Sequence, residues 1–540
     1  MSRNRGADAL AASLVAEGVK RVFTLSGNHI MPVFDAAFDA GIELVHVRHE
    51  AAAVHMADAW ARLTGEVGVA MVTGGPGHAN AVGALYTAAM GESAVVLLSG
   101  HAPLNQLGMA AFQEMRQAEM ASVVTKASGV SARPDDVGTD FVKAVRVAKA
   151  GRPGPVHLSL PTDVLEGECS TAAGRPGEGR GPIIPAAQYP ALNAAPAFDR
   201  LGRAKCPLIL CGPMCMTRAG REKMAILEAA SGIPVIGMES PRGVADPSLG
   251  AFAEVLARAD CVLLVGKRLD FTLRFGKSFG AECEFIQIDT DPSEIERTRR
   301  AVGDRLKGTT QSATFESLDA LTRAVGQPAS AEWRNEVRAA ISYRPAAWDS
   351  ASSSAPGRLH PVQMLRPLQA LLDAHPDSVF VSDGGEIGQW AQACLHAPNR
   401  VINGVAGSIG AALPFAVAAS LARPGAPVIA VMGDGTFGFH PAEIDTAVRY
   451  RAPFVAIVGN DARWNAEYQI QVRDYGRERV IGTELLPARY DQVAIGFGAH
   501  GEHVTAAADL MAAVQRATAS KRPAVVNVMI EGLAAPDLKR

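Results

Sequence analysis

Two acidic residues in this chain each lie just past a short apolar run, a placement that favours metal binding. Asp434 stands in Gly433-Asp434-Gly435-Thr436, directly after the apolar run 427–432, and Asp461 lies just past the apolar run 454–458. Runs of this length and composition predict buried strands of a parallel sheet. Ligands bind at the carboxyl ends of such strands. Two carboxylates there suit Mg²⁺, which takes one or two carboxylates together with phosphate oxygens.

This spacing resembles the metal-diphosphate signature of thiamine diphosphate (ThDP) enzymes, in which Gly-Asp-Gly is followed by Asn-Asn. Here Asp461 stands where the second Asn is usual, and it adds a negative charge beside a diphosphate. The resemblance implies a metal set of Asp434, Asp461 and the carbonyl of Arg463. It also implies that Gly435 and Thr436 contact the cofactor, since glycine lets the backbone approach closely. Taken alone, the motif is equally an Asp-Gly turn at the surface.

Glu50 is the foremost catalytic candidate. It lies in Arg48-His49-Glu50, at the start of a predicted helix that runs to Arg62. ThDP enzymes carry a similar glutamate at the opening of a helix in their first domain. The resemblance implies that this carboxyl group hydrogen-bonds the cofactor's aminopyrimidine ring and so assists its activation. The alternative is a glutamate that only stabilises the positive end of the helix dipole.

Three glycine-containing turns are similar to the loops that hold the cofactor in this family. Residues 73–80 resemble a Ser-Gly-Pro-Gly turn, and residues 383–388 resemble the loop whose backbone N–H groups hold the diphosphate. Residues 403–410 resemble the turn under the cofactor, in which an apolar side chain separates its two rings. The cofactor-binding residues that these matches imply are Gly75, Pro76, Asn80, Gly385, Glu386, Ile387, Gly407, Ser408 and Ile409. Each turn alone could be an ordinary strand–helix connection.

The chain as a whole predicts several α/β domains. It has 540 residues, too many for one core, with 48% hydrophobic and 20% charged residues. Short apolar runs alternate with helical patterns, which favours parallel sheets. Four strands are predicted in each of three blocks: 21–24, 68–73, 94–99 and 156–160; 207–210, 234–237, 261–265 and 285–288; 379–382, 427–432, 454–458 and 523–529.

Small and turn-forming residues predict linkers at 167–195 and 328–360. We therefore predict three doubly wound parallel-sheet domains of the ThDP-enzyme type. A pyrimidine-binding domain covers 1–166, and a central nucleotide- or CoA-type domain covers 190–327. A diphosphate- and Mg²⁺-binding domain covers 358–540, with 532–540 as a short segment that could close the site.

The substrate class is predicted from resemblances within the family. Ala111-Phe112-Gln113-Glu114, with Gln117, and the run 266–276 resemble 2-hydroxyacyl-CoA lyases, although acetolactate synthases share the first of these. Leu25-Ser26-Gly27-Asn28-His29-Ile30 and the Trp at 464 resemble benzaldehyde lyase. We predict a lyase that cleaves a 2-hydroxyacyl-CoA, reversibly, to a ketone or aldehyde and formyl-CoA. The alternatives are a CoA-independent lyase or carboligase like benzaldehyde lyase, an acetolactate synthase, and a non-catalytic nucleotide-binding protein on the same fold.

The lyase prediction assigns roles to particular side chains. His29 takes the hydroxyl proton as the general base, and Asn28 and Gln113 orient substrate oxygens. For His29, a packing or capping role is the alternative. Residues assigned to substrate binding are Phe112, Asn403 and Trp464, together with Arg268, Arg274 and Lys277 for the CoA phosphates. The alternative for the three cations is a solvated basic surface.

Cofactors and partners follow from the same resemblance. ThDP and Mg²⁺ are expected, with ADP or CoA in the central domain, where FAD is less favoured. A glutamate that activates the cofactor across a subunit boundary implies at least a homodimer, and a homotetramer is usual in the family. The net charge of −3 gives no indication of nucleic-acid binding, and no apolar stretch is long enough to cross a membrane. Seven scattered cysteines favour the cytoplasm.

Overall fold

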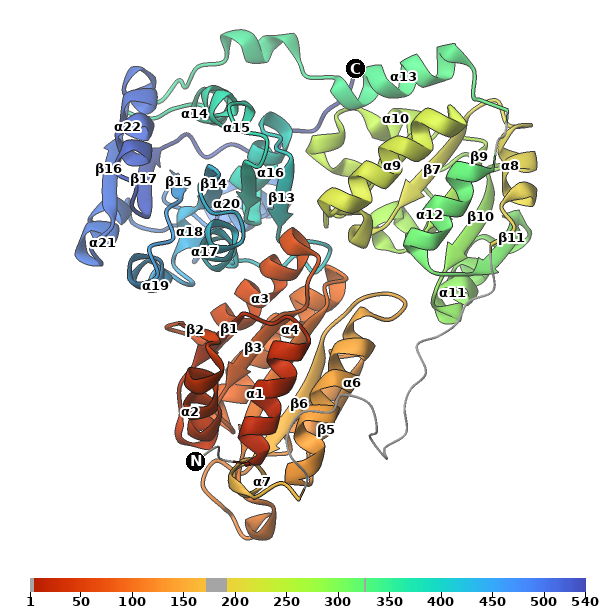
Figure 1. Cartoon of the computed structure of the whole chain (residues 1–540). Coiled ribbons are helices and arrows are strands. Elements are labelled where there is room, and N and C mark those ends of the chain that lie inside the picture. Colours follow the sequence, from red (N-terminus) through yellow and green to blue (C-terminus); the bar gives the residue numbers. More distant parts are fainter. Residues whose placement is uncertain (1–3, 171–191, 325–326) are drawn as a thin grey trace. The chain divides into compact units, whose positions relative to one another are not determined.

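The computed structural model describes residues 4–170, 192–324 and 327–540, and Figure 1 labels most of their elements. These residues form three β-sheets in which every pair of neighbouring strands is parallel. They divide into two compact units. The first unit comprises residues 4–170 with 417–422 and 442–452, and the second comprises the other described residues. The prediction of three parallel α/β sheets is confirmed.

The first sheet has six strands in the order β2-β1-β3-β4-β6-β5. Its strands are β1 (Arg21–Leu25), β2 (Glu43–His46), β3 (Gly68–Val72), β4 (Val95–His101), β5 (Ala127–Val130) and β6 (Val156–Pro161). Its helices are α1 (Gly6–Ala16), α2 (Met31–Ala40), α3 (Glu50–Thr64), α4 (Pro76–Met90), α5 (Gln117–Ser122), α6 (Val137–Lys149) and α7 (Thr162–Glu166).

Alternating side chains along these strands supply two buried faces. Val22 belongs to the core that α1 and α6 cover, and these two helices lie side by side in Figure 1. Phe23 points to the opposite face, where its ring meets Trp60 of α3. Because both faces are covered by helices, the central strands are largely apolar, and β3 is buried along its whole length. The sheet thereby holds the amino ends of α3 and α4 in place.

The second sheet has five strands in the order β11-β10-β9-β7-β8. Its strands are β7 (Pro207–Cys211), β8 (Val235–Gly237), β9 (Cys261–Val265), β10 (Glu284–Asp289) and β11 (Leu306–Gln311). Its helices are α8 (Ala195–Leu201), α9 (Arg218–Ser231), α10 (Phe252–Leu256), α11 (Pro292–Val302), α12 (Thr314–Arg323) and α13 (Ala331–Ser342).

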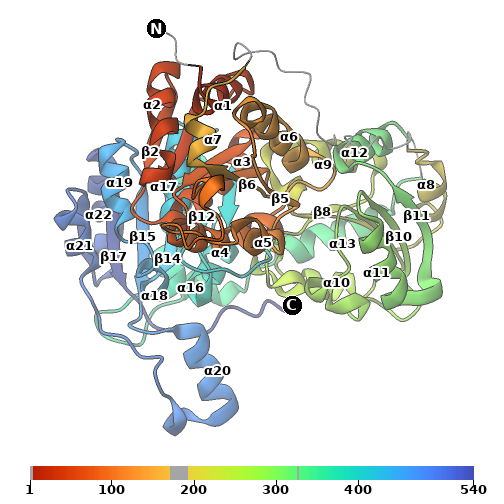
Figure 2. The ribbon, with the colours of Figure 1, turned by 90° about the horizontal axis from the view of Figure 1, so that it is seen from below.

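The third sheet has six strands in the order β13-β12-β14-β15-β17-β16. Its strands are β12 (Val379–Ser382), β13 (Asn399–Ile402), β14 (Val428–Gly433), β15 (Val455–Asn460), β16 (His500–Val504) and β17 (Ala524–Met529). Around it in the sequence are α14 (Pro361–Leu365), α15 (Gln369–Asp373), α16 (Gly385–Cys394), α17 (Ala412–Ala422), α18 (Asp434–Phe437), α19 (Glu443–Arg449), α20 (Asn465–Tyr475), α21 (Tyr490–Gly496) and α22 (Ala507–Ala519). Helix α20 projects away from this sheet in Figure 2.

The predicted linkers have different outcomes. Most of 167–195 lies outside the described residues. The stretch 328–360 is not only a linker, because it contains α13, whose residues Trp333, Val337 and Ala340 are buried in the core of the second sheet. The Trp333 indole donates a hydrogen bond to the carbonyl of Pro207, at 2.9 Å. The small residues that follow α13 obscured this amphipathic helix in the sequence.

Among the described residues, no helix combines the length and the apolar character that crossing a membrane requires.

Candidate functional site

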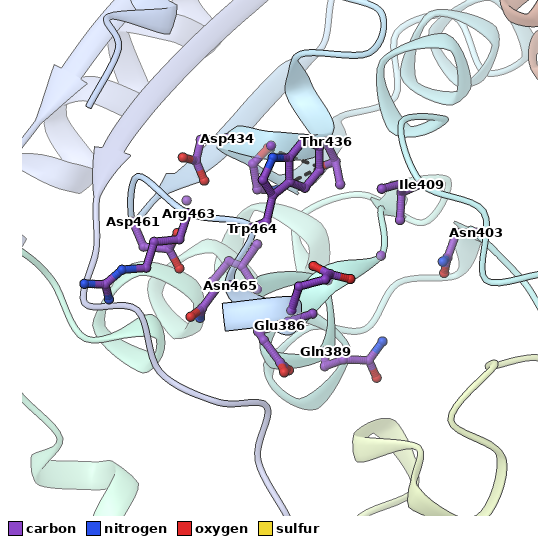
Figure 3. Close-up of a pocket in the computed structure, with 18 of the residues that line it drawn as sticks. Glu386, Gln389, Asn403, Ile409, Asp434, Thr436, Asp461, Arg463, Trp464 and Asn465 are labelled. Atoms are coloured by element: carbon purple, nitrogen blue, oxygen red, sulfur yellow. Dashed lines mark hydrogen bonds between the residues drawn. The ribbon is translucent and has the colours of Figure 1, made fainter. Parts of the chain in front are cut away.

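The carboxyl ends of β14 and β15 bring the two predicted metal ligands together. Asp434 follows β14 directly, and Asp461 follows β15. The two strands are parallel neighbours, with Gly433 opposite Gly459. Both acids line one pocket in the second unit, and Figure 3 shows them on the same side of it. The prediction that the two carboxylates lie at neighbouring strand ends is confirmed.

Both carboxylates are buried, with relative exposures of 2% for Asp434 and 7% for Asp461. Asp434 Oδ2 and Asp461 Oδ1 have no hydrogen-bond partner among the described residues. Burial raises the pKa of Asp434, although backbone N–H groups that include those of Ala462 and Arg463 oppose the shift. Burial and the neighbouring Asp434 charge raise the pKa of Asp461. Acids that ionise with difficulty unless a counter-charge is present fit a divalent cation.

The described residues contain no group of three or more His, Cys, Asp or Glu side chains that could hold a metal. A cation at Asp434 and Asp461 would therefore need backbone or phosphate oxygens as further ligands, which is the usual environment of Mg²⁺. Arg463 lines the same pocket, as predicted. Its guanidinium lies over the ring of Tyr468, 4.2 Å from the centroid. The ligand role of its carbonyl stays a prediction.

The predicted cofactor loops form much of the remaining wall. Gly385, Glu386, Ile387, Asn403, Gly407, Ile409, Gly435, Thr436 and Trp464 line the pocket, whereas Ser408 does not. Figure 3 shows Asn403 and Ile409 on the side away from the two acids, with Trp464 and Glu386 between. The wall thus combines an acidic end with an apolar and amide-lined end. With a divalent cation at its acidic end, such a cavity suits a ligand that has both a diphosphate and an apolar ring.

Glycine is required where the pocket elements touch. A Cβ at Gly435 would lie 2.7 Å from the Trp464 ring, and a Cβ at Gly384 would lie 2.7 Å from Cγ2 of Ile409. Gly385 and Gly407 have φ angles of 77° and 67°, a region that L side chains seldom adopt. These glycines let the backbone at Gly435 pack against the Trp464 ring and the backbone at Gly384 pack against Ile409. The pocket wall is therefore closely packed at both places.

Several pocket residues escaped the sequence analysis. Pro241 and Arg242 come from the region of the second sheet. Gln389 lies in the second turn of α16, and Asn465 is the first residue of α20. A guanidinium nitrogen of Arg242 lies 3.3 Å from Oε2 of Glu386. The two residues are far apart in the sequence, so no local pattern could have linked them. For Gln389, its helical spacing after Gly385 was an available signal.

The segment after β17 runs beside the pocket. The amide of Ala535 donates to Glu386, at 2.9 Å, and Asn465 donates its side-chain amide to the carbonyl of Leu533, also at 2.9 Å. A Cβ on Gly532 would lie 3.2 Å from Oδ2 of Asp461. The stretch 532–540, to which any C-terminal lid would be confined, therefore contacts pocket residues, in an irregular conformation.

The first unit places Glu50 in a second polar site. Glu50 is the first residue of α3, is only 9% exposed, and accepts a hydrogen bond from the Asn80 side chain at 3.0 Å. The side chain of the preceding His49 caps the helix by accepting from the amide of Ala51. A buried carboxylate with a neutral amide partner keeps an acceptor available for a ligand. The structure thus brings together Glu50 and Asn80, two residues that were predicted separately.

The predicted glycine turn and the 111–114 segment meet beside Glu50's helix. Gln113 has a φ of 58°, and a Cβ at Gly75 would lie 2.8 Å from Cβ of Gln113. The amide of Gly75 donates to Oε1 of Gln117, at 2.8 Å. Pro76 is the first residue of α4. Gln117 is buried and also donates to the Gly100 carbonyl and to Ser159. The turn is therefore fixed by an internal polar network.

His29 is buried near this turn. Its Nδ1 lies 3.4 Å from the hydroxyl of Thr73, and its ring centroid lies 6.0 Å from that of Phe112. Burial and the nearby His101 lower its pKa. Phe112 is 67% exposed, and Asn28 is also exposed. A neutral imidazole next to an exposed aromatic ring is compatible with the predicted base, and no contact here assigns that role.

The three predicted CoA-binding cations differ in their surroundings. The guanidinium of Arg268 lies 3.2 Å from the carboxylate of Glu294, and this ion pair partly neutralises the charge that Arg268 could offer to a phosphate. Arg274 and Lys277 are exposed, on the turn that follows β9. Arg274 and its neighbour Phe275 have positive φ angles of 48° and 53°. None of the three lines the pocket described above.

Comparisons with known proteins agree with this geometry. Residues 4–120 match the family model described as the thiamine pyrophosphate enzyme N-terminal TPP binding domain, 194–311 match its central domain, and 383–528 match its C-terminal TPP binding domain. Thiamine pyrophosphate is another name for ThDP.

Relatives that align over most of the chain include proteins named acetolactate synthase and proteins named 2-hydroxyacyl-CoA lyase 2. The acetolactate synthase large subunit IlvG of Mycobacterium tuberculosis is 32% identical, over 97% of this chain and 95% of the relative. The 2-hydroxyacyl-CoA lyase 2 of Homo sapiens is 30% identical, over 98% of this chain and 90% of the relative. The acetolactate synthase large subunit of Parasynechococcus marenigrum is 27% identical, over 97% and 87%.

Proposed function

Because the chain belongs to the thiamine pyrophosphate enzyme family, we propose that it is a ThDP-dependent carbon–carbon lyase that cleaves a 2-hydroxyacyl-CoA to a ketone or aldehyde and formyl-CoA, reversibly. The observation that carries the choice of substrate is the pair of exposed cations, Arg274 and Lys277, on the turn after β9. Exposed cations can form charge-assisted contacts with the phosphates of CoA. Relatives named 2-hydroxyacyl-CoA lyase, aligned over nearly the whole chain, support it.

In this proposal the second unit holds the cofactor. Asp434 and Asp461 would bind Mg²⁺, with the Arg463 carbonyl and the diphosphate oxygens as further ligands. The backbone at Gly385 and Gly435 would approach the diphosphate, and Ile409 would support the apolar rings. Bound ThDP would supply an electron sink for cleavage of a carbon–carbon bond next to a carbonyl group.

The first unit would supply the proton-handling groups. Glu50, held by Asn80, would hydrogen-bond the aminopyrimidine ring. His29, whose lowered pKa keeps it neutral near pH 7, would take the substrate's hydroxyl proton. Gln113 and Asn28 would orient substrate oxygens, and Phe112, Asn403 and Trp464 would contact the acyl group.

The proposal is tested by incubating the protein with 2-hydroxyisobutyryl-CoA, ThDP and Mg²⁺ and following formyl-CoA by chromatography. Formyl-CoA is expected only when ThDP is present. Arg274→Ala together with Lys277→Ala should raise KM for the CoA substrate about tenfold, with little change in kcat, because two charge-assisted contacts are lost from binding. The matched control replaces Lys307 and Arg323, two other cations of the central region. Absence of formyl-CoA under these conditions would contradict the proposal.

A second candidate is an acetolactate synthase, which the relative of 32% identity favours. It would join two pyruvate molecules, and a FAD in the central region would accompany it. A CoA-independent lyase like benzaldehyde lyase is a third. Pyruvate and benzoin are therefore run in parallel: acetolactate from pyruvate would identify the synthase, and benzaldehyde from benzoin would identify the CoA-independent lyase.

We further propose that the working enzyme is at least a homodimer and that it assembles as a homotetramer. In this assembly Glu50 of one subunit would serve the Asp434–Asp461 pocket of another. The family resemblance of Glu50 supports this arrangement. ADP or CoA is the proposed ligand of the central region. A cytoplasmic location is supported by seven cysteines that are all free thiols.

A further inference from the structure

A buried acid links two walls of the cofactor pocket from behind. Asp383 follows β12 and is 1% exposed. Its own amide donates to the carbonyl of Val431 on β14, at 3.0 Å, which fixes the start of the side chain to the sheet. Asp383 itself does not line the pocket. Its carboxylate therefore does not touch a ligand in the cavity. It can affect such a ligand only through the backbone groups that it hydrogen-bonds.

Three backbone amides donate to this carboxylate, and they come from two separate segments of the chain. Gly384 donates to Oδ1 at 2.7 Å. Gly410 donates to both oxygens, at 3.0 and 3.1 Å, and Ala412 donates to Oδ2 at 3.1 Å. Gly384 begins the 384–387 segment at the start of α16, whereas Gly410 lies in the 404–411 turn and Ala412 begins α17 directly after that turn. The Asp383 carboxylate is thus a bridge between the two segments.

Both bridged segments reach the pocket. The first contributes Gly384 to Ile387, and the second contributes Gly407 and Ile409. They also touch each other directly, since a Cβ on Gly384 would lie 2.7 Å from Ile409 and 3.0 Å from Nδ2 of Asn403. A small shift of one loop would therefore disturb the other.

The electrostatics favour an ionised acceptor at neutral pH. Complete burial raises the pKa of Asp383 to about 6, and the N–H groups of Gly384, Ala412 and Gly410 oppose that shift. Asp383 lies next to the first residues of α16 and α17, Gly385 and Ala412, where helix dipoles also favour a negative charge. A carboxylate offers only acceptors to these amides, which no neutral side chain of the same shape can do.

We propose that Asp383 is a positioning residue for ThDP: its carboxylate ties the 384–387 segment at the start of α16 to the 404–411 turn, so that both meet the cofactor as one preformed surface. This inference rests on ThDP binding in the pocket and not on which substrate is cleaved, so the formyl-CoA assay can fail while the positioning role stands.

Asp383→Asn is the direct test, since the amide keeps the shape but turns one acceptor into a donor that faces backbone N–H groups. We expect the Kd for ThDP with Mg²⁺, measured by calorimetry on the full chain, to rise about tenfold or more. We expect kcat at saturating ThDP to stay near the wild-type value, and amide hydrogen exchange to accelerate at Gly410 and Ala412.

The matched control is Asp163→Asn in the first unit. Asp163 likewise accepts from backbone amides, those of Leu104 and Val164, and lies outside the pocket. It should leave the ThDP Kd unchanged. An unchanged Kd and unchanged exchange in Asp383→Asn would overturn the proposal. If that variant does not fold, exchange in the ThDP-free wild-type protein decides: slow exchange at Gly410 and Ala412 supports a preformed surface, and exchange as fast as that of an exposed loop overturns it.

Discussion

Asp434 and Asp461 should bind protons and Mg²⁺ in competition. The pKa of each is raised in the folded chain, so in the metal-free protein this pair keeps protons that the unfolded chain releases near pH 4. Their contribution to stability is therefore greatest at low pH and is lost as the pH rises through the raised pKa values. A bound cation neutralises the two ionised carboxylates and so removes this loss of stability at higher pH. We expect Mg²⁺ with ThDP to raise Tm more at about pH 8 than at about pH 5.5.

Asp461→Asn separates this effect from other titrating groups. The neutral side chain should raise the Tm of the metal-free protein at about pH 8. Because an Asn is usual at this position in the family's metal signature, Mg²⁺ should still bind, and the Mg²⁺-dependent Tm shift should lose most of its dependence on pH. Asp491→Asn is a control of opposite sign. At Asp491, hydrogen bonds from Arg489 and Gln492 outweigh burial and lower the pKa, so its loss should decrease Tm at the same pH. A metal-free Tm that falls in Asp461→Asn would show that the two acids do not repel each other.

Glu50→Gln should abolish most of the turnover while leaving the fold intact. The amide keeps the size of the side chain and a contact with Asn80, and it loses the charge that a proton-handling group needs. We expect kcat to fall by about 10²- to 10⁴-fold, with ThDP binding retained by calorimetry. Glu66→Gln, at an exposed position two residues past the end of α3, is the control. Full activity in Glu50→Gln would reduce Glu50 to a helix-stabilising role.

At the scale of elements, the loop after β15 stores backbone strain beside the metal ligands. Ala462 has a φ of 61°, a region that L side chains seldom adopt, and its amide donates to the side chain of Asn460, at 3.2 Å. Ala462→Gly should therefore raise stability by about 1 kcal/mol, measured by denaturant unfolding. The same change at Ala512, an exposed position inside α22, should lower stability by about 1 kcal/mol. Destabilisation at both positions would contradict the strain argument.

The accuracy of strand prediction followed position in the sheet. Every interior strand was predicted, because helices on both faces require a continuous apolar run. Five of the six edge strands were not: β2, β5, β11, β13 and β16. Strand β16, His500–Val504, shows the reason, since only its last residue is buried. An edge strand shares one side with solvent, so its sequence carries polar residues that hide the pattern.

Prediction of the site was limited by sequence distance. Asp434, Asp461 and Glu50 stand in compact motifs, and a motif carries its own signal. Arg242 and Glu386 are brought together only by the tertiary fold. In the sequence, Asp383 is recognised only as the first residue of the glycine-rich stretch 383–388. No local pattern shows that its carboxylate binds amides on a turn far along the chain. A residue whose role is to position other residues depends on tertiary contacts, so its role cannot be predicted from a local motif.

At the scale of the whole molecule, the proposed function assigns Glu50 of the first unit and the Asp434–Asp461 pocket of the second unit to one active site. If Glu50 of one subunit serves the Asp434–Asp461 pocket of another, inactive variants should complement each other. Co-refolding equal amounts of Glu50→Gln and Asp434→Asn should restore about a quarter of wild-type activity, because about half of random dimers are hybrids with one intact site of two. Each variant refolded alone is the control. Activity no higher than the sum of the two would contradict an active site shared between subunits.

The most direct measurement is a competition in one tube. The wild-type protein receives 2-hydroxyisobutyryl-CoA and pyruvate at equal concentration, with ThDP and Mg²⁺, and both formyl-CoA and acetolactate are quantified over time. The account predicts formyl-CoA as the main product, formed in equal amount with acetone and absent without ThDP. Acetolactate as the main product, with the CoA thioester left intact, would contradict it and would make the chain a synthase.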